Sequence, residues 1–166
     1  MKKLTKSLAF VFLLFALLTG YSVQAFASTS SYKNTIDSFN VTTNSKYQPS
    51  GGNTYCNIFA QDVMKKLSTP LPNGTCSTML NALSGNKNPH WKSITATQAQ
   101  SRANNGYSTI GITSDHIVVV YPHGNTASTV KDVYMSMAGY KCFNDTKITY
   151  AWKSTRLSEV KFYSYY

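Results

Sequence analysis

The chain has 166 residues, with 16 Lys or Arg against six Asp or Glu, so its formal charge is +10 at pH 7. Such a basic excess favours anionic polymers and would attract nucleic acid only without specificity, although an ordinary solvated surface also explains it. The sequence has no Cys-x-x-Cys pair and no glycine-rich phosphate loop, and its three histidines are far apart. It therefore gives no reason to expect a metal or another cofactor.

The first 27 residues have the pattern of an export signal. Three early lysines precede an apolar run over residues 8–18, and the small-residue motif Ala25-Phe26-Ala27 follows. Cleavage before Ser28 would leave 139 residues, about one domain, and nothing later approaches the ~18 consecutive apolar residues of a membrane span. We therefore expect residues 1–27 to be a signal peptide and the mature protein to be secreted or periplasmic.

The mature chain begins with a polar segment and continues with helical patterns. Residues 28–53 are rich in Ser, Thr, Asn and Gly, so we expect an extended or mobile lead-in before a single domain over residues 54–166. Helices are predicted at 55–67, 77–83 and 96–104. Phe59, Val63 and Leu67 recur at every fourth position in the first of these, and Thr95 with Gln98 matches a capping box before the last.

Beyond residue 106 the pattern changes from helix to strand. Short runs rich in aromatic and β-branched residues predict strands at 107–112, 116–121, 130–137, 147–152 and 160–165. Helices followed by hairpin-linked strands indicate an α+β domain, in which an antiparallel sheet packs against the helix that begins near Cys56.

Cys56 is the strongest candidate for a reactive residue. It lies at the start of a predicted helix, where free amide protons and the helix dipole favour a thiolate. His116 opens an apolar strand and supplies a possible base, so that the two residues would form a nucleophile and base pair. The alternative for His116 is a partly buried histidine that only makes hydrogen bonds.

The three cysteines, Cys56, Cys76 and Cys142, all follow the predicted signal peptide. An odd number in an exported protein suits one free nucleophile and one disulfide, which would then join Cys76 to Cys142. The alternative is a bridge between Cys56 and Cys76, which would remove the proposed nucleophile. The sequence leaves this choice open.

Three segments together resemble a known enzyme family. Tyr55-Cys56-Asn57-Ile58-Phe59 with Asp62-Val63 resembles the Cys-Asn-x-Phe-x-x-Asp-Val signature of NlpC/P60-like and CHAP-like amidohydrolases, and residues 91–107 and 116–122 are similar to the middle helix and histidine strand of that family. The resemblance implies a papain-like fold of the NlpC/P60 type, with the cysteine helix packed on the histidine sheet. It also implies hydrolysis of an amide bond in bacterial peptidoglycan.

The family usually has a third residue that orients the histidine. The candidates here are Ser136 and Asn144, because Met137 occupies a place where the family pattern often has a polar residue. We also expect Tyr55, Asn57 and Trp91, which belong to the matching segments, to contact the substrate.

The sequence therefore predicts a secreted cysteine peptidoglycan hydrolase, an amidase or endopeptidase that works through an acyl-enzyme. Its expected partner is peptidoglycan or another anionic cell-wall polymer, and the sequence has no positive sign of an inhibitor protein. Two alternatives remain. One is a papain-like protease or toxin that acts on protein, and the other is a non-catalytic protein that binds the cell wall or a glycan.

Overall fold

The computed structural model describes residues 28–86 and 88–166. The predicted signal peptide, residues 1–27, lies outside the described residues. In the described part of the chain, no helix has both the length and the apolar character needed to cross a membrane.

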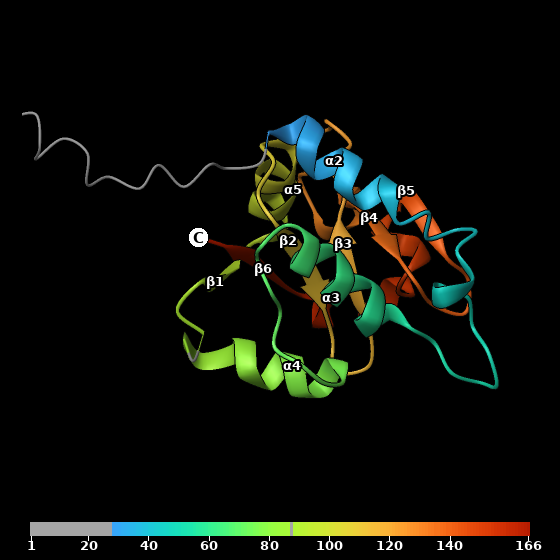
Figure 1. Cartoon of the computed structure of the whole chain (residues 1–166). Coiled ribbons are helices and arrows are strands. Elements are labelled where there is room, and N and C mark those ends of the chain that lie inside the picture. Colours follow the sequence, from blue (N-terminus) through green and yellow to red (C-terminus); the bar gives the residue numbers. More distant parts are fainter. Residues whose placement is uncertain (1–27, 87) are drawn as a thin grey trace, which may run out of the picture.

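The centre of the molecule is a six-stranded sheet in which every neighbouring pair is antiparallel (Figure 1). The strand order is β1-β6-β2-β3-β4-β5, so the C-terminal strand β6 inserts between β1 and β2. The strands are β1 (Trp91–Ile94), β2 (Thr109–Ile112), β3 (Ile117–Val120), β4 (Tyr134–Met137), β5 (Phe143–Lys147) and β6 (Lys161–Tyr165).

In residues 28–86 and 88–166, four α-helices and several short 3-10 helices surround this sheet. The α-helices are α2 (Thr29–Ser38), α3 (Cys56–Lys66), α4 (Cys76–Leu83) and α5 (Ala96–Asn104). The 3-10 helices are η1 (Ser45–Tyr47), η2 (Ser84–Asn86), η3 (Val130–Asp132), η4 (Ile148–Tyr150) and η5 (Ser154–Glu159).

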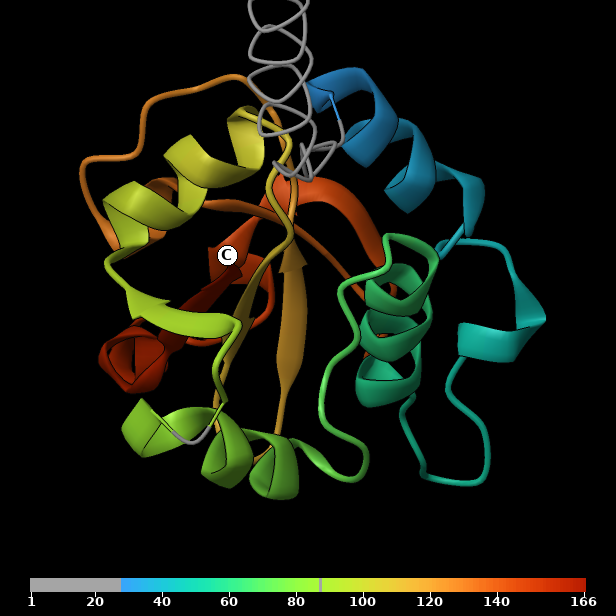
Figure 2. The ribbon, with the colours of Figure 1, turned by 60° about the vertical axis from the view of Figure 1, so that its left-hand side comes forward.

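The helices contact the central strands directly. Helix α3 packs against β3 and β4, α5 packs against β2, β3 and β6, and α2 touches both α3 and α5. Figure 2 shows α5 and α3 on the two sides of the view, with the central strands between them. The predicted α+β architecture, with helices packed on an antiparallel sheet, is confirmed.

The core explains why these strands lie in the middle of the sheet. All four residues of β3 are fully buried, and so are the side chains of Phe59 and Val63 on α3. A continuous apolar strand is typical of a position that is covered on both faces, whereas the apolar stripe of α3 requires only one buried face. The stripe predicted from the sequence is therefore the face that fixes α3 on the sheet.

The expectation that residues 28–53 form an extended or mobile lead-in is wrong. They contain α2 and η1, and Tyr32, Ile36, Val41 and Tyr47 belong to the same buried core as the rest of the chain. The Tyr32 hydroxyl lies between β2 and β3, where it donates to the Val120 carbonyl at 2.9 Å and accepts from the Thr109 N–H at 3.2 Å. The polar composition concealed these few buried anchors.

Two further predictions, one of a strand and one of a helical segment, also require correction. Residues 147–152 do not form a strand, because Ile148 and Trp152 turn inward through η4, and the strand β5 ends at Lys147. Residues 91–94, which resembled part of a helical segment, form the edge strand β1. The predicted helix 96–104 is confirmed together with its Thr95–Gln98 capping box.

Candidate active site

Cys56 is the first residue of α3 and is only 4% exposed. Its helix begins differently from the others in the described part of the chain. The side chains of Ser28, Thr75 and Thr95 cap α2, α4 and α5, whereas Tyr55 makes no capping hydrogen bond at the start of α3. The first amide protons of α3 therefore have no side-chain acceptor from the cap.

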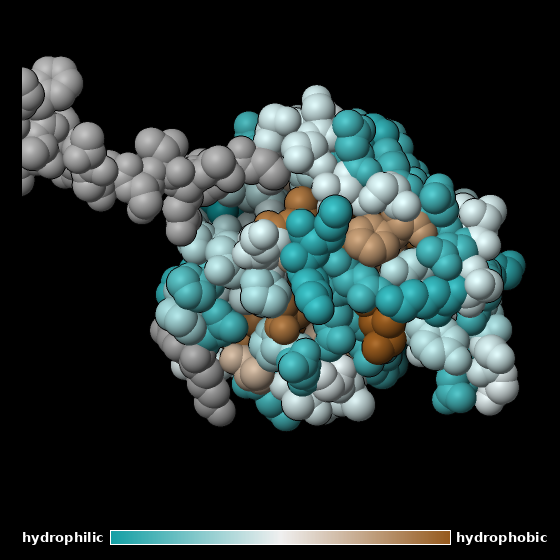
Figure 3. All heavy atoms as spheres, viewed as in Figure 1, coloured by the Kyte–Doolittle hydropathy of each residue, from teal (hydrophilic) through white to brown (hydrophobic). Residues whose placement is uncertain are grey.

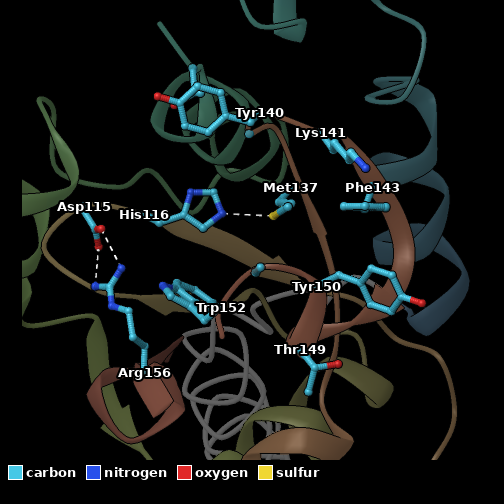
Figure 4. A pocket seen from close by; sticks show the side chains of 13 residues that line it. Asp115, His116, Met137, Tyr140, Lys141, Phe143, Thr149, Tyr150, Trp152 and Arg156 are labelled. Atoms are coloured by element: carbon cyan, nitrogen blue, oxygen red, sulfur yellow. Dashed lines mark hydrogen bonds and ion pairs between the residues drawn. The ribbon is translucent and has the colours of Figure 1, made fainter. Parts of the chain in front are cut away.

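His116 lies immediately before β3, as the strand pattern predicted within one residue. Its ring meets the edge of the Trp152 indole, with the ring centroids 5.1 Å apart. Its Nε2 atom is 3.0 Å from the Met137 sulfur, and Figure 4 shows this contact from β4. A thioether is only a weak acceptor. The Met137 sulfur therefore occupies the place beside His116 Nε2 where the oxygen of an orienting residue would lie.

The surroundings of Cys56 lower the pKa of its thiol well below the usual range. The largest cause is a hydrogen bond from the Cys76 thiol, and burial acts in the opposite direction. His116 contributes a hydrogen bond and an electrostatic interaction, and the backbone N–H of Ile117 adds a further hydrogen bond. Together these interactions outweigh desolvation, so the pKa of Cys56 is lowered and its thiolate form is favoured.

Cys76 and Cys142 do not form the expected disulfide, and all three cysteines are free. Cys76 is the first residue of α4, and its sulfur lies 3.7 Å from that of Cys56. The Cys142 thiol instead donates to the carbonyl of Tyr47 at 3.3 Å. The fold thus brings Cys76 to the candidate nucleophile and holds Cys142 at another place.

Ser136 and Asn144 are not found against His116. The Ser136 hydroxyl donates to the Asn144 side-chain oxygen, and the Asn144 amide donates to Asp37 at 2.8 Å. The Tyr121 hydroxyl donates to the same carboxylate at 2.9 Å. This network joins α2 to the sheet. The two predicted orienting residues therefore belong to a structural network, and strand alternation explains why Met137 rather than Ser136 faces the histidine.

The three residues expected to contact substrate differ in their positions. Trp91 is 1% exposed, and its indole N–H donates to the Pro70 carbonyl at 3.1 Å, so it is a core residue rather than a binding residue. The Asn57 amide donates to the Gly74 carbonyl at 3.1 Å, just before α4. Tyr55 is half-buried beside Cys56.

A cavity of about 770 Å³ opens beside His116 (Figure 4). Its walls combine aromatic rings with a few charged groups. They include Thr54, two residues before Cys56, and Met137, which contacts the histidine. The remaining lining residues are Asp115, Gly139, Tyr140, Lys141, Phe143, Thr149, Tyr150, Ala151, Trp152 and Arg156. No local sequence pattern predicts this set, because its members come from separate strands, 3-10 helices and loops that meet only in the fold.

An ion pair fixes the turn that carries His116. The Arg156 guanidinium binds both oxygens of Asp115, at 2.8 and 3.0 Å, and the Thr113 hydroxyl donates to the same carboxylate at 2.7 Å. The Arg156 hydrogen bonds hold the pKa of Asp115 well below its usual range. Asp115 therefore pairs with Arg156 and Thr113 in the turn before β3 and does not act as a base toward the imidazole.

The other two histidines have separate partners. The His123 ring stacks on Tyr134, and its Nδ1 atom lies 2.6 Å from the Asp145 carboxylate. The His90 ring stacks on Tyr165. Within residues 28–86 and 88–166, no group of three or more His, Cys, Asp or Glu residues is arranged to hold a metal ion.

Comparison with known proteins adds no relative. No family model matches the chain, and no curated protein matches it in sequence. The candidate site therefore stands on its own geometry, which joins an uncapped cysteine helix, a histidine immediately before a strand and a cavity beside that histidine.

Proposed function

We propose that this protein is a cysteine-dependent amide hydrolase with a papain-like fold of the NlpC/P60 type, exported from the cell to cleave an amide bond in bacterial peptidoglycan. The observation that carries the proposal is the geometry at Cys56, which begins an uncapped helix with the Cys76 sulfur 3.7 Å from its own, in surroundings that lower the pKa of its thiol through Cys76 and His116. An idle buried thiol would have a raised pKa instead.

The chemistry follows from these positions. The Cys56 thiolate attacks the amide carbonyl, and the sulfur–carbon bond forms as the carbonyl oxygen takes up negative charge. Uncapped amide protons at the start of α3 stabilise this oxyanion. The His116 imidazolium gives its proton to the leaving amine, and the neutral ring then activates the water that releases the acyl group.

The cavity beside His116 supports an extended polymeric substrate. Tyr140 and Tyr150 are largely exposed at 79% and 63%, so aromatic surface faces the solvent where a substrate would enter. Lys141 adds a positive charge on the same wall. Amphipathic rings and a cation suit a peptide-bearing glycan with free carboxylates. The segment from Thr54 to Cys56 connects this wall to the nucleophile.

The test is digestion of purified peptidoglycan with the reduced protein, followed by mass spectrometry of the soluble fragments. We expect new fragments with the wild type, none with Cys56→Ala, and a rate lowered by about 10²–10⁴-fold with His116→Gln, the usual contribution of a general acid and base. The masses of the fragments identify the bond. Absence of fragments from walls of several compositions would rule out this substrate, and cleavage of protein substrates instead would favour the protease alternative.

A further inference from the structure

The two cysteines at the candidate site have an arrangement that amide hydrolysis does not need. Cys56 and Cys76 begin two different helices, and their sulfur atoms lie 3.7 Å apart. A disulfide has an S–S distance of about 2.05 Å, so the sulfurs are separated by roughly 1.7 Å more than a bond requires. Both side chains are nearly buried, at 4% and 6% exposure, so each sulfur has the other as a close neighbour.

A hydrogen bond holds the two helix starts together. The Asn57 side chain, which follows Cys56 on α3, donates to the Gly74 carbonyl at 3.1 Å, two residues before Cys76. Gly74 has a φ of 120°, a conformation that favours glycine and that turns the chain into α4. The turn at Gly74 and the hydrogen bond from Asn57 thus keep Cys76 beside Cys56.

The pKa values of the two thiols are also shifted in opposite directions. The Cys56 pKa is lowered, while the hydrogen bond to Cys56 and burial raise the pKa of Cys76. The Cys56 sulfur is therefore the better nucleophile toward an oxidant, and Cys76 remains beside it as a protonated thiol. A low-pKa cysteine next to a second thiol is the usual arrangement of a reversible redox pair.

We propose that Cys56 and Cys76 form such a pair, in which a hydroperoxide converts the candidate nucleophile into an intramolecular disulfide. The Cys56 thiolate attacks the peroxide O–O bond, gives a sulfenic acid and releases water after protonation. The Cys76 sulfur then attacks the Cys56 sulfur, the S–O bond breaks and a second water leaves. Two thiols and one hydrogen peroxide thus give one disulfide and two waters.

The consequence for activity rests on the proposed function. The disulfide removes the Cys56 thiolate, so the oxidised protein is latent and a dithiol reductant restores it. Without Cys76, the sulfenic acid has no adjacent thiol and proceeds to higher, irreversible oxidation states. The disulfide with Cys76 therefore inhibits the enzyme reversibly and prevents irreversible oxidation of Cys56.

The experiment treats the reduced protein with one equivalent of hydrogen peroxide and maps its peptides without reduction. Lys65 and Lys66 lie between the two cysteines, so trypsin separates them into different peptides unless a disulfide joins them. We expect a Cys56–Cys76 linked peptide, an intact mass that is two hydrogens lower, and full reversal by dithiothreitol. Cys142→Ser is the matched control, because Cys142 contacts Tyr47 instead, and it should behave like the wild type.

In Cys76→Ser, oxidation should stop at Cys56 and form no disulfide. Its Cys56 should gain oxygen and react with dimedone, which traps sulfenic acids, and no linked peptide should form. Oxygen on Cys56 with Cys76 free in the wild type, a linkage that involves Cys142, or no loss of thiols would overturn the proposal. Because the linked peptide is detected without any substrate, its formation in a protein that hydrolyses nothing would refute the proposed function alone.

Discussion

At the scale of single residues, the sulfur of Cys56 is subject to opposing influences. Burial favours the neutral thiol, whereas the Cys76 thiol, the His116 ring and the Ile117 N–H stabilise the thiolate. Hydrogen bonds to an ion in a nearly buried place are stronger than in water, because the local dielectric is low. Burial would raise the pKa of a cysteine without partners. At Cys56 it also strengthens the hydrogen bonds that lower the pKa.

The Ser136–Asn144–Asp37 network gives a prediction that separates structure from catalysis. We expect Ser136→Ala and Asn144→Ala each to lower the free energy of unfolding by about 1–3 kcal/mol, because each leaves a polar partner without its hydrogen bond. Neither change should move the pH at which Cys56 becomes reactive. Urea unfolding and alkylation of Cys56 at several pH values measure the two effects. A shift of the alkylation profile would mean that the network reaches His116.

The sequence could predict Cys56 and His116 but could not place their neighbours. A helix start and a strand start carry local signals, and these put each residue within one position of where it lies. The contacts of Cys76 depend on how the loop before α4 folds back on α3, which no local pattern encodes. Counting cysteines therefore favoured a Cys76–Cys142 bridge and left a Cys56–Cys76 bridge as the alternative, and the fold places the Cys76 sulfur beside that of Cys56.

At the scale of secondary structure, Tyr32 connects the N-terminal helix to the sheet. We expect Tyr32→Phe to destabilise the protein by about 1–3 kcal/mol, because it leaves the Val120 carbonyl and the Thr109 N–H buried without their partner. The control is Tyr140→Phe, since Tyr140 is 79% exposed. Urea unfolding of both variants is the measurement. Equal stability of the two would show that α2 is not fastened to the sheet by this hydroxyl.

The elements that the sequence predicted well are those with strong local signals. Helix α5 has a complete capping box, and α3 has an apolar residue at every fourth position. The edge strands β1 and β5 escaped prediction because they are short and largely polar, with alternation too weak to distinguish strand from loop. Pairing with β6 and β4 creates these two strands, and such pairing is a property of the whole sheet.

At the scale of the whole molecule, a polar surface is combined with a net positive charge. The face shown in Figure 3 is mostly hydrophilic, with hydrophobic side chains in small separate groups. The chain carries a formal charge of +10, and the part that follows the predicted signal peptide keeps an excess of seven positive charges. Capture of an anionic wall polymer would therefore depend on electrostatic attraction.

Ionic strength should control binding to the wall. We expect Cys56→Ala, which lacks the proposed nucleophile, to sediment with insoluble peptidoglycan at low salt and to be released as salt is raised past about 0.1 M, where the Debye length is about 10 Å. Co-sedimentation over a salt series measures this release. Binding that stays constant over the series would assign recognition to the cavity alone rather than to the basic surface.

The most direct test of the account is the pH dependence of Cys56 alkylation by iodoacetamide, followed by peptide mass spectrometry. Because its folded-state pKa is lowered, the thiolate persists as pH falls below the ordinary cysteine value of about 8.5 and is lost only near the lowered pKa. We expect Cys56 to react in mildly acidic solution, and the reaction midpoint to move to higher pH in His116→Gln and Cys76→Ala, because each change removes a stabilising partner of the thiolate. An ordinary midpoint in the wild type, unchanged in both variants, would contradict an activated nucleophile.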